Sequence, residues 1–396
     1  MRPDDLYSSP NALAADYARF RVADRLLLSG HSHQAWPDCG FAAQSQAWLD
    51  AAEFVDDKWP RAFAKADEVK RGYARLLGEP DADIAIEQNT LDLIVRFLSA
   101  LPLRTRPRLV STDGEFHTLR RLLDRLSEED GIEIVRIAAS PVNTLSERLA
   151  AMVDARTAVV FCSSVLFQTA RIVPGLPIVA EACVKHGAEL LIDTYHHLNV
   201  VPFDRTGLEQ AFIVGGGYKY CQLGEGACCL RIPKNCTLRP ITTGWFSEFD
   251  KLTATPGRVG YGSGGSRFGG ATFDPASCYR AAAVFAFFKE RGLTPELLRE
   301  VSQHQIGLLA ARFDALDLDP KLIRRDREVP LNEIGGFLVL WSSRAGEISQ
   351  KLKTAGVYTD HRGNALRLGP APYLSDAQLN AAMEILGRIV HGLPVT

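Results

Sequence analysis

The sequence has no long apolar run, no marked excess of either charge and no apolar leader. None of the apolar runs in its 396 residues approaches the roughly 18–20 residues that a membrane helix requires, so no transmembrane segment is expected. Lysine and arginine number 45 against 47 aspartates and glutamates, and the net charge of −2 gives no reason to expect nucleic acid or an anionic membrane as a partner. No secretory-type apolar segment follows Met1, so the expected location is the cytoplasm.

Several binding motifs are missing as well. The eight cysteines are scattered without a CxxC pair, which argues against a zinc knuckle and a disulfide framework. We expect reduced, mostly apolar cysteines, with a reactive Cys221 as the alternative. The glycine-rich stretch 250–272 contains neither a P-loop pattern nor a GxGxxG between a strand and a helix, which disfavours a nucleotide-binding enzyme. His31 and His33 have no third partner at metal-ligand spacing, so no metal site is expected.

From about residue 65, short apolar strands alternate with helices. The predicted strands are 84–86, 108–111, 132–137, 158–161, 189–193, 211–214 and 226–232, the last of them antiparallel. Alternation at this spacing predicts an α/β fold with a three-layer, mostly parallel sheet. We predict a large domain at 65–289, a smaller α+β domain at 290–396, and an N-terminal segment at 1–64 that joins the small domain and the mouth of the active site.

The chemistry is expected where two predicted buried strands end. Lys219 follows three glycines and a tyrosine after the apolar run 211–214, and Asp193 ends the run 189–192. Pyridoxal phosphate requires an amine for a Schiff base and a carboxylate that keeps its pyridine nitrogen protonated. Either residue alone would be read as a solvated lysine or a turn aspartate, whereas the pair favours this cofactor.

Other residues at the carboxyl ends of predicted strands, where α/β sheets bind ligands, extend this site. Thr90 and Leu91 open a helix whose N–H groups suit a phosphate, although an ordinary N-cap would look the same. The remaining predicted cofactor contacts are Phe116 over the ring, Ser164, His196 near the carboxylate, and Tyr218, whose phenol would also act as an acid or base.

One charged residue in the C-terminal third, Arg367, is unexpected at its position. Arg367 lies in the strand 365–368, which is otherwise apolar. A planar guanidinium that binds a substrate carboxylate would account for it. A structural ion pair is the alternative.

Together these motifs resemble the class V, fold-type I pyridoxal-phosphate enzymes, and among them kynureninase most. Asp193-Thr194-Tyr195-His196 is similar to the family's Asp-x-x-His, Tyr218-Lys219-Tyr220 to its Ser-Tyr-Lys-Tyr, and Gly244-Trp245-Phe246 to its Gly-Trp-Phe. Asn89-x-Leu91, Phe116 and the segment 366–372 also match in the family's order, so the resemblance covers residues from about 30 to 390.

The resemblance implies a role for each matched residue. Lys219 would carry the cofactor, Asp193 would contact its ring nitrogen, and Tyr218 would contact the phosphate and transfer protons. Trp245 and Thr272 would reach the phosphate of a neighbouring subunit, because this family forms shared active sites across a homodimer.

The implied substrate site consists of Arg367, which would bind the α-carboxylate, and the loop containing His31 and Ser32. The family reaction is hydrolytic cleavage of the Cβ–Cγ bond of kynurenine or a related aryl substrate to an aromatic product and alanine. The sequence departs from the family at 30–34, 116–119 and 91–92, and at the family's Asn-Pro pair, which is here Asp274-Pro275 or Thr272. Two of these segments shape the substrate pocket.

Other functions remain as alternatives. They are a class V aminotransferase, another pyridoxal-phosphate-dependent β-lyase, and a non-catalytic binding module. A cysteine desulfurase is disfavoured, because its nucleophilic cysteine lies on a loop well after the lysine and no cysteine follows Cys278 here.

Overall fold

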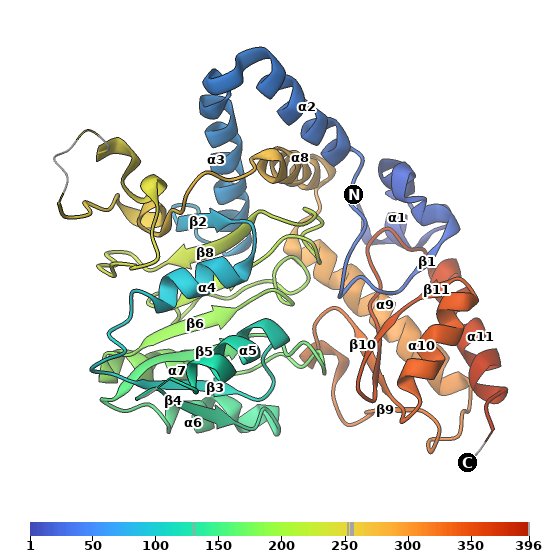
Figure 1. The fold of residues 1–396 in the computed structure, drawn as a ribbon. Helices are drawn as coiled ribbons and strands as arrows, with labels where there is room; N and C mark the ends of the chain where they lie inside the picture. Colours follow the sequence, from blue (N-terminus) through green and yellow to red (C-terminus); the bar gives the residue numbers. More distant parts are fainter. Residues whose placement is uncertain (130, 252, 254–256, 395–396) are drawn as a thin grey trace.

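A computed structural model describes residues 1–129, 131–251, 253 and 257–394, so the glycine-rich stretch 250–272 lies partly outside the described residues. Its centre is a seven-stranded sheet with the order β2-β8-β7-β6-β5-β3-β4 (Figure 1). Antiparallel pairing occurs only between β8 and its two neighbours within this described sheet, as predicted. The strands are β2 (Asp83–Glu87), β3 (Arg108–Thr112), β4 (Glu133–Ile137), β5 (Thr157–Ser163), β6 (Glu189–Asp193), β7 (Phe212–Gly215) and β8 (Cys228–Ile232).

Helices cover both faces of this sheet. In β5, Val159 and Phe161 pack with α4 (Thr90–Leu98) and α5 (His117–Leu126), whereas Val160 and Cys162 pack with the opposite layer. That layer consists of α6 (Leu145–Ala150) and α7 (Leu176–His186). Side chains of a strand alternate between its faces, so this run of buried residues serves two cores at once. The predicted three-layer α/β fold is confirmed.

A second set of helices joins the sheet to the C-terminal region. α2 (Cys39–Phe54) and α3 (Trp59–Leu76) both pack against α8 (Ala276–Arg291), and α9 (Pro295–Ala315) follows α8 in the chain (Figure 1). Gly72 allows the close contact of α3 with α8, because a Cβ there would lie 2.3 Å from the Phe285 ring. No helix among the described residues is long and apolar enough to cross a membrane.

The C-terminal region contains a four-stranded antiparallel sheet with the order β12-β13-β10-β9. Its strands are β9 (Arg324–Arg325), β10 (Leu338–Trp341), β12 (Asp360–Arg362) and β13 (Ala365–Leu368), and its helices are α10 (Ala345–Thr354) and α11 (Asp376–His391). The N-terminal segment reaches this region, since β1 (Leu26–Leu27) pairs in parallel with β11 (Val357–Tyr358). α1 (Pro3–Tyr7) lies nearby and contacts α9.

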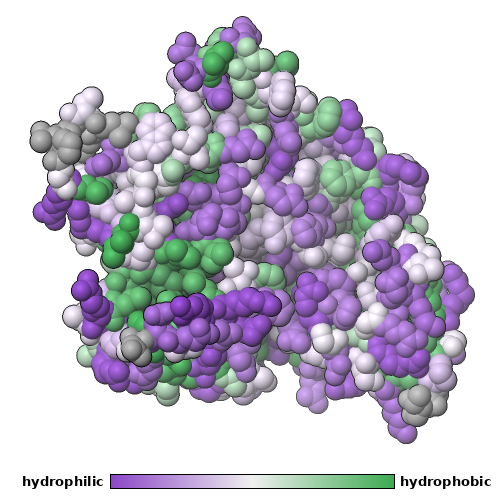
Figure 2. All heavy atoms as spheres, viewed as in Figure 1, coloured by the Kyte–Doolittle hydropathy of each residue, from purple (hydrophilic) through white to green (hydrophobic). Residues whose placement is uncertain are grey.

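On the face shown in Figure 2, hydrophobic side chains gather over α4 and the surface beside it. Leu91 in the first turn of α4 is 37% exposed. An apolar surface of this kind marks a candidate contact region.

A buried ion pair in β8 gives a test of the fold. Arg231 is 1% exposed and donates to both carboxylate oxygens of Glu79 at 2.8 and 2.9 Å. Arg231→Ala removes both hydrogen bonds and leaves the Glu79 carboxylate only its 3.8 Å contact with Arg205. We therefore expect a loss of about 3–5 kcal/mol in the free energy of unfolding, measured by urea denaturation. The control Arg21→Ala, in an exposed pair with Asp24, should cost less than about 1 kcal/mol. Equal losses would contradict this interpretation of Arg231.

Candidate active site

A cavity of about 430 Å³ lies at the carboxyl ends of β5, β6 and β7. Parallel neighbours bring these ends to one edge of the sheet, and Asp193 of β6 is in register with Val214 of β7. Of the residues predicted from the sequence, the cavity is lined by Thr90, Leu91, Phe116, Asp193, His196, Tyr218 and Lys219.

Two of the three glycines before the lysine are required by the close packing of Tyr195 and Leu223. A Cβ on Gly216 would lie 2.2 Å from the Tyr195 ring, and one on Gly217 would lie 2.7 Å from Leu223. The chain therefore turns tightly over Tyr195 after β7, and Lys219 Nζ lies 4.6 Å from the centroid of that ring. Tyr195 also lines the cavity, although the sequence motif suggested no role for it beyond a spacer.

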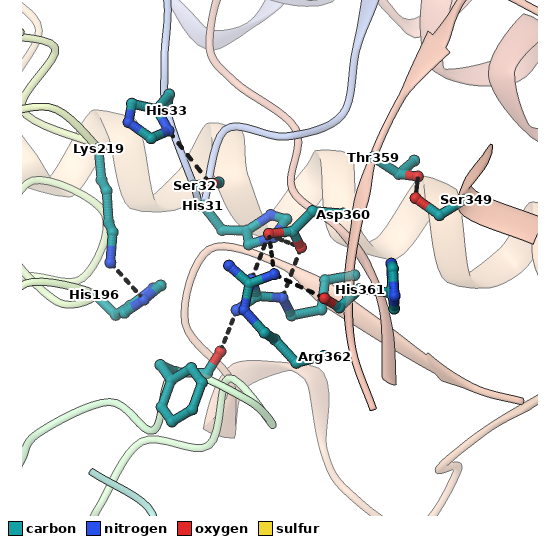
Figure 3. Close-up of polar contacts among 12 residues, drawn as sticks. His31, Ser32, His33, His196, Lys219, Ser349, Thr359, Asp360, His361 and Arg362 are labelled. Atoms are coloured by element: carbon teal, nitrogen blue, oxygen red, sulfur yellow. Dashed lines mark hydrogen bonds and ion pairs between the residues drawn. The ribbon is translucent and has the colours of Figure 1, made fainter. Parts of the chain in front are cut away.

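Lys219 has an unusual electrostatic environment. Its side chain is buried, and this burial lowers the pKa of the amine to about 7, with the Asp193 carboxylate acting in the opposite direction. Nζ lies 2.7 Å from His196 Nε2 (Figure 3). Burial and the nearby Lys219 charge hold the pKa of His196 well below its ordinary value, so the imidazole is neutral. About half of an amine with this pKa is unprotonated at pH 7, and the unprotonated amine is a nucleophile for carbonyl carbons.

Two carboxylates belong to this part of the site, the half-buried Asp193 and the buried Glu115. Burial raises the pKa of Asp193, while the Tyr195 backbone N–H, which donates to Oδ1 at 2.8 Å, acts against that rise. Glu115 is 2% exposed and accepts from Thr112 Oγ1 at 2.7 Å and from the Ser163 hydroxyl at 2.5 Å. Glu115 thereby ties the loop before Phe116 to the end of β5. We did not predict it, although an acidic residue directly before Phe116 was a possible signal.

At the other end of the cavity, α4 begins with a capped turn. The Asn89 side chain accepts from the Asp92 backbone N–H at 3.0 Å and donates to the Asp92 carboxylate at 2.7 Å. Asp92 is thus engaged with the cap, and Thr90 and Leu91 are the first-turn residues at the cavity. The first N–H groups of a helix have no partner within it and favour an anion.

Arg367 is held in an ion pair. Its Nε and Nη2 donate to the two oxygens of Asp360 at 2.8 and 2.5 Å, and its Nη1 donates to the Phe167 carbonyl at 2.6 Å. The ion pair that we considered as the alternative therefore exists in the structure. Asp360 lies directly opposite Arg367 in the β12–β13 pair. The signal that we missed is Gly363-Asn364, which is typical of a hairpin turn.

The structure does not bring every predicted residue to the cavity. His31 is fully buried and hydrogen-bonds Asp360 through Nε2 at 2.7 Å. Ser32 Oγ lies 3.3 Å from His33 Nδ1. Ser164 is turned away from the cavity, because its hydroxyl donates to the Asp193 carbonyl at 3.2 Å, whereas Ser163 lines the cavity.

Trp245 and Thr272 are both exposed and do not line the cavity of their own chain. We predicted that these two residues contact the cofactor phosphate of a neighbouring subunit, so both would act in a dimer.

The chain is similar to several known proteins. No protein-family model matches it. It is 23% identical over 356 residues to an uncharacterized aminotransferase of Bacillus subtilis, covering 87% of this chain and 90% of that protein. A mutant of C-DES with glycine covalently linked to its PLP cofactor superposes with a TM-score of 0.83 at 17% identity, covering 94% of this chain and 98% of that one. A complex of the cystine C–S lyase C-DES with cysteine persulfide gives 0.80 at 18% identity over 92% and 98%. The chain therefore has the fold of these structures.

The residues at the cavity have the chemistry that pyridoxal phosphate requires. The cavity holds a buried, nucleophilic amine, a carboxylate one strand away and the aromatic ring of Phe116. His196 Nδ1 is a buried polar atom without a hydrogen-bond partner among the described residues. The N-terminus of α4 supplies N–H groups for an anion at the same cavity. This set of residues fits the cofactor.

The pKa of Lys219 gives a prediction for the cofactor-free protein. With a pKa of about 7, roughly one tenth of the amine is unprotonated at pH 6 and roughly nine tenths at pH 8. Reductive methylation of Lys219, followed by peptide mass spectrometry, should therefore rise steeply between these pH values and level off above them. Surface lysines should continue to gain reactivity up to about pH 10. A Lys219 profile that follows the surface lysines would contradict the lowered pKa.

Proposed function

We propose that this protein is a pyridoxal-phosphate-dependent enzyme that acts on an amino acid. One observation carries the proposal: a buried Lys219 amine and the Asp193 carboxylate, from the ends of neighbouring parallel strands, line the same cavity. Phe116 and the N-terminus of α4 line it as well. The similarity to an aminotransferase and to structures of a C–S lyase supports the same proposal.

Each residue has a distinct task in this proposal. Bound pyridoxal phosphate supplies an electron sink for the bonds at the substrate α-carbon. Lys219 provides the attachment point, and Asp193 holds a proton at the ring nitrogen. Phe116 covers the ring, and the first-turn N–H groups of α4 hold the phosphate. Tyr218, which is half-buried at the cavity, is placed to move a proton near Lys219.

For the reaction, we favour an aminotransferase or a β-lyase. Neither the relative nor the two solved structures described above is named as a kynureninase, and the names of these proteins match the alternative better. Hydrolytic cleavage of kynurenine remains the second candidate. The observation in its favour is the aromatic lining of the cavity by Phe116, Phe167 and Tyr195, which suits an aryl side chain.

The cofactor proposal is tested by reconstitution. Protein incubated with pyridoxal phosphate and freed of excess should be yellow, and borohydride should remove the visible absorbance and fix the label on Lys219. Lys219→Ala should abolish this label, whereas Lys185→Ala, at an exposed lysine of α7, should leave it unchanged. Protein that stays colourless under saturating cofactor would overturn the proposed function.

The reaction is tested by product analysis. An aminotransferase forms an oxo acid only with an amino acceptor present, whereas a β-lyase releases the side-chain fragment without one. Kynurenine or 3-hydroxykynurenine would instead give a fluorescent aminobenzoate and alanine. We expect oxo acid or released fragment from at least one neutral amino acid. Release of aminobenzoate as the only product would favour the second candidate.

We also propose a homodimer with shared active sites. Trp245 is 42% exposed. Hydrophobic side chains gather over α4 (Figure 2), and Leu91 of this helix also lines the cavity. In this assembly Trp245 and Thr272 of one copy would lie at the phosphate end of the other. Lys219→Ala and Trp245→Ala proteins, each weakened alone, should recover activity when their subunits are mixed. Complete absence of recovery after verified subunit exchange would contradict shared sites.

A further inference from the structure

Glu115 is a buried carboxylate at the edge of the candidate active site. Its Oε1 accepts from Thr112 Oγ1 at 2.7 Å and from the Ser163 backbone N–H at 3.1 Å, and its Oε2 accepts from Ser163 Oγ at 2.5 Å. Both hydroxyl contacts have the short lengths typical of O–H···O⁻ bonds. Burial raises the pKa of Glu115, and the hydrogen bonds from Ser163 and Thr112 act against this rise. Glu115 is thus the acceptor for both hydroxyl protons.

This arrangement fixes the direction of the Ser163 hydroxyl. A serine hydroxyl has one proton and two lone pairs. Because Glu115 accepts the proton, the Ser163 oxygen can offer only lone pairs to a group in the cavity that it lines. Ser163 and Asp193 are register partners in the parallel strands β5 and β6, so their side chains point to the same face of the sheet. This end of the cavity therefore presents two neighbouring acceptors.

The two ends of the cavity consequently differ in polarity. The first-turn N–H groups of α4 favour an anion, whereas the oxygens of Ser163 and Asp193 favour a group that carries a proton. Phe116 directly follows Glu115, and the centroid of its ring lies 5.4 Å from Lys219 Nζ. The hydrogen bonds of Glu115 therefore hold in place both this ring and the acceptor beside Asp193.

We propose that Glu115 is a positioning residue that acts through Ser163: it accepts the hydroxyl proton, so that Ser163 faces the cavity as an acceptor beside Asp193 and favours a cationic ring N–H there. This inference rests on the proposed function, in which the protonated ring nitrogen of pyridoxal phosphate lies at Asp193. The oxygen end of the fixed Ser163 dipole stabilises positive charge on that ring. An uncharged ring gains much less from the same dipole.

The first test compares two ligands that differ at one ring position. Each of the two acceptors is expected to contribute roughly tenfold to the preference for a charged ring N–H. By calorimetry, the natural protein should therefore bind pyridoxal phosphate about 100-fold more tightly than its 1-deaza analogue, in which C–H replaces the ring nitrogen.

Glu115→Gln changes the direction of one hydrogen bond at nearly constant shape. The new amide N–H donates to Ser163 Oγ, so the Ser163 proton must turn towards the cavity. This variant should lower the preference for pyridoxal phosphate over the 1-deaza analogue about tenfold. An unchanged preference would overturn the inference.

A double-variant cycle shows whether Glu115 acts through Ser163. Ser163→Ala removes the acceptor itself and should also lower the preference about tenfold. Adding Glu115→Gln to Ser163→Ala should then change the preference no further. Effects of the two substitutions that multiply would contradict the inference. An unchanged preference in Ser163→Ala would also overturn it, even if Glu115→Gln folds poorly.

Thr112 provides the matched control, because it donates to the same carboxylate but is not among the residues that line the cavity. Thr112→Val removes this hydrogen bond at nearly constant shape and should lower Tm by a few degrees. It should leave the ligand preference unchanged. An equal loss of preference in Thr112→Val would indicate a purely structural role for Glu115 and would overturn the inference.

Cofactor-free protein tests the same cluster without the proposed function. 4-Aminopyridine carries a ring N–H and a positive charge at neutral pH, whereas aniline has a similar shape and is neutral. In NMR titrations, 4-aminopyridine should bind at least about tenfold more tightly than aniline, and Glu115→Gln should reduce this difference. Equal binding of the two probes to the natural protein would overturn the inference. Failure of the natural protein to bind pyridoxal phosphate would instead overturn the proposed function.

Discussion

The site depends on the burial of one amine. Because the Lys219 side chain is removed from water, its pKa is lowered to about 7 and it is a nucleophile near neutral pH. That burial is produced by the turn over Tyr195, which a side chain at Gly216 would prevent. Asp193, at the end of the neighbouring strand, limits how far the pKa of Lys219 is lowered. One pair of parallel strand ends therefore sets both the position and the reactivity of the lysine.

The fold around this amine was largely readable from the sequence, since strand–helix alternation is a local pattern. The predicted first and last residues of the strands were less accurate, and β8 shows the physical reason. We expected it to begin at Gly226, but Gly226 and Ala227 have positive φ values of 81° and 49°, so the strand begins at Cys228. Such a conformation is set by tertiary contacts; a Cβ at Gly226 would lie 2.6 Å from Ser277, which is distant in the chain.

The sequence predicted the site residues at the ends of strands better than those whose contacts are distant in the chain. Asp193 is the last residue of β6, Lys219 follows β7, and both line the cavity. The choice between Ser163 and Ser164 depended on which face of β5 meets the cavity, which local pattern does not specify. His31 comes close to Asp360 across more than three hundred residues, so no spacing rule links them. Arg367 was singled out as a charge that needs a partner, and the structure pairs it with an internal carboxylate, that of Asp360.

A crystal structure of the protein grown with pyridoxal phosphate tests the central claim most directly. The proposed function predicts continuous density from the cofactor to Lys219 Nζ, the ring nitrogen within hydrogen-bonding distance of Asp193, and the phosphate at the first turn of α4. Cofactor bound at any other lysine, or a cavity at Lys219 that stays empty at saturating cofactor, would contradict it.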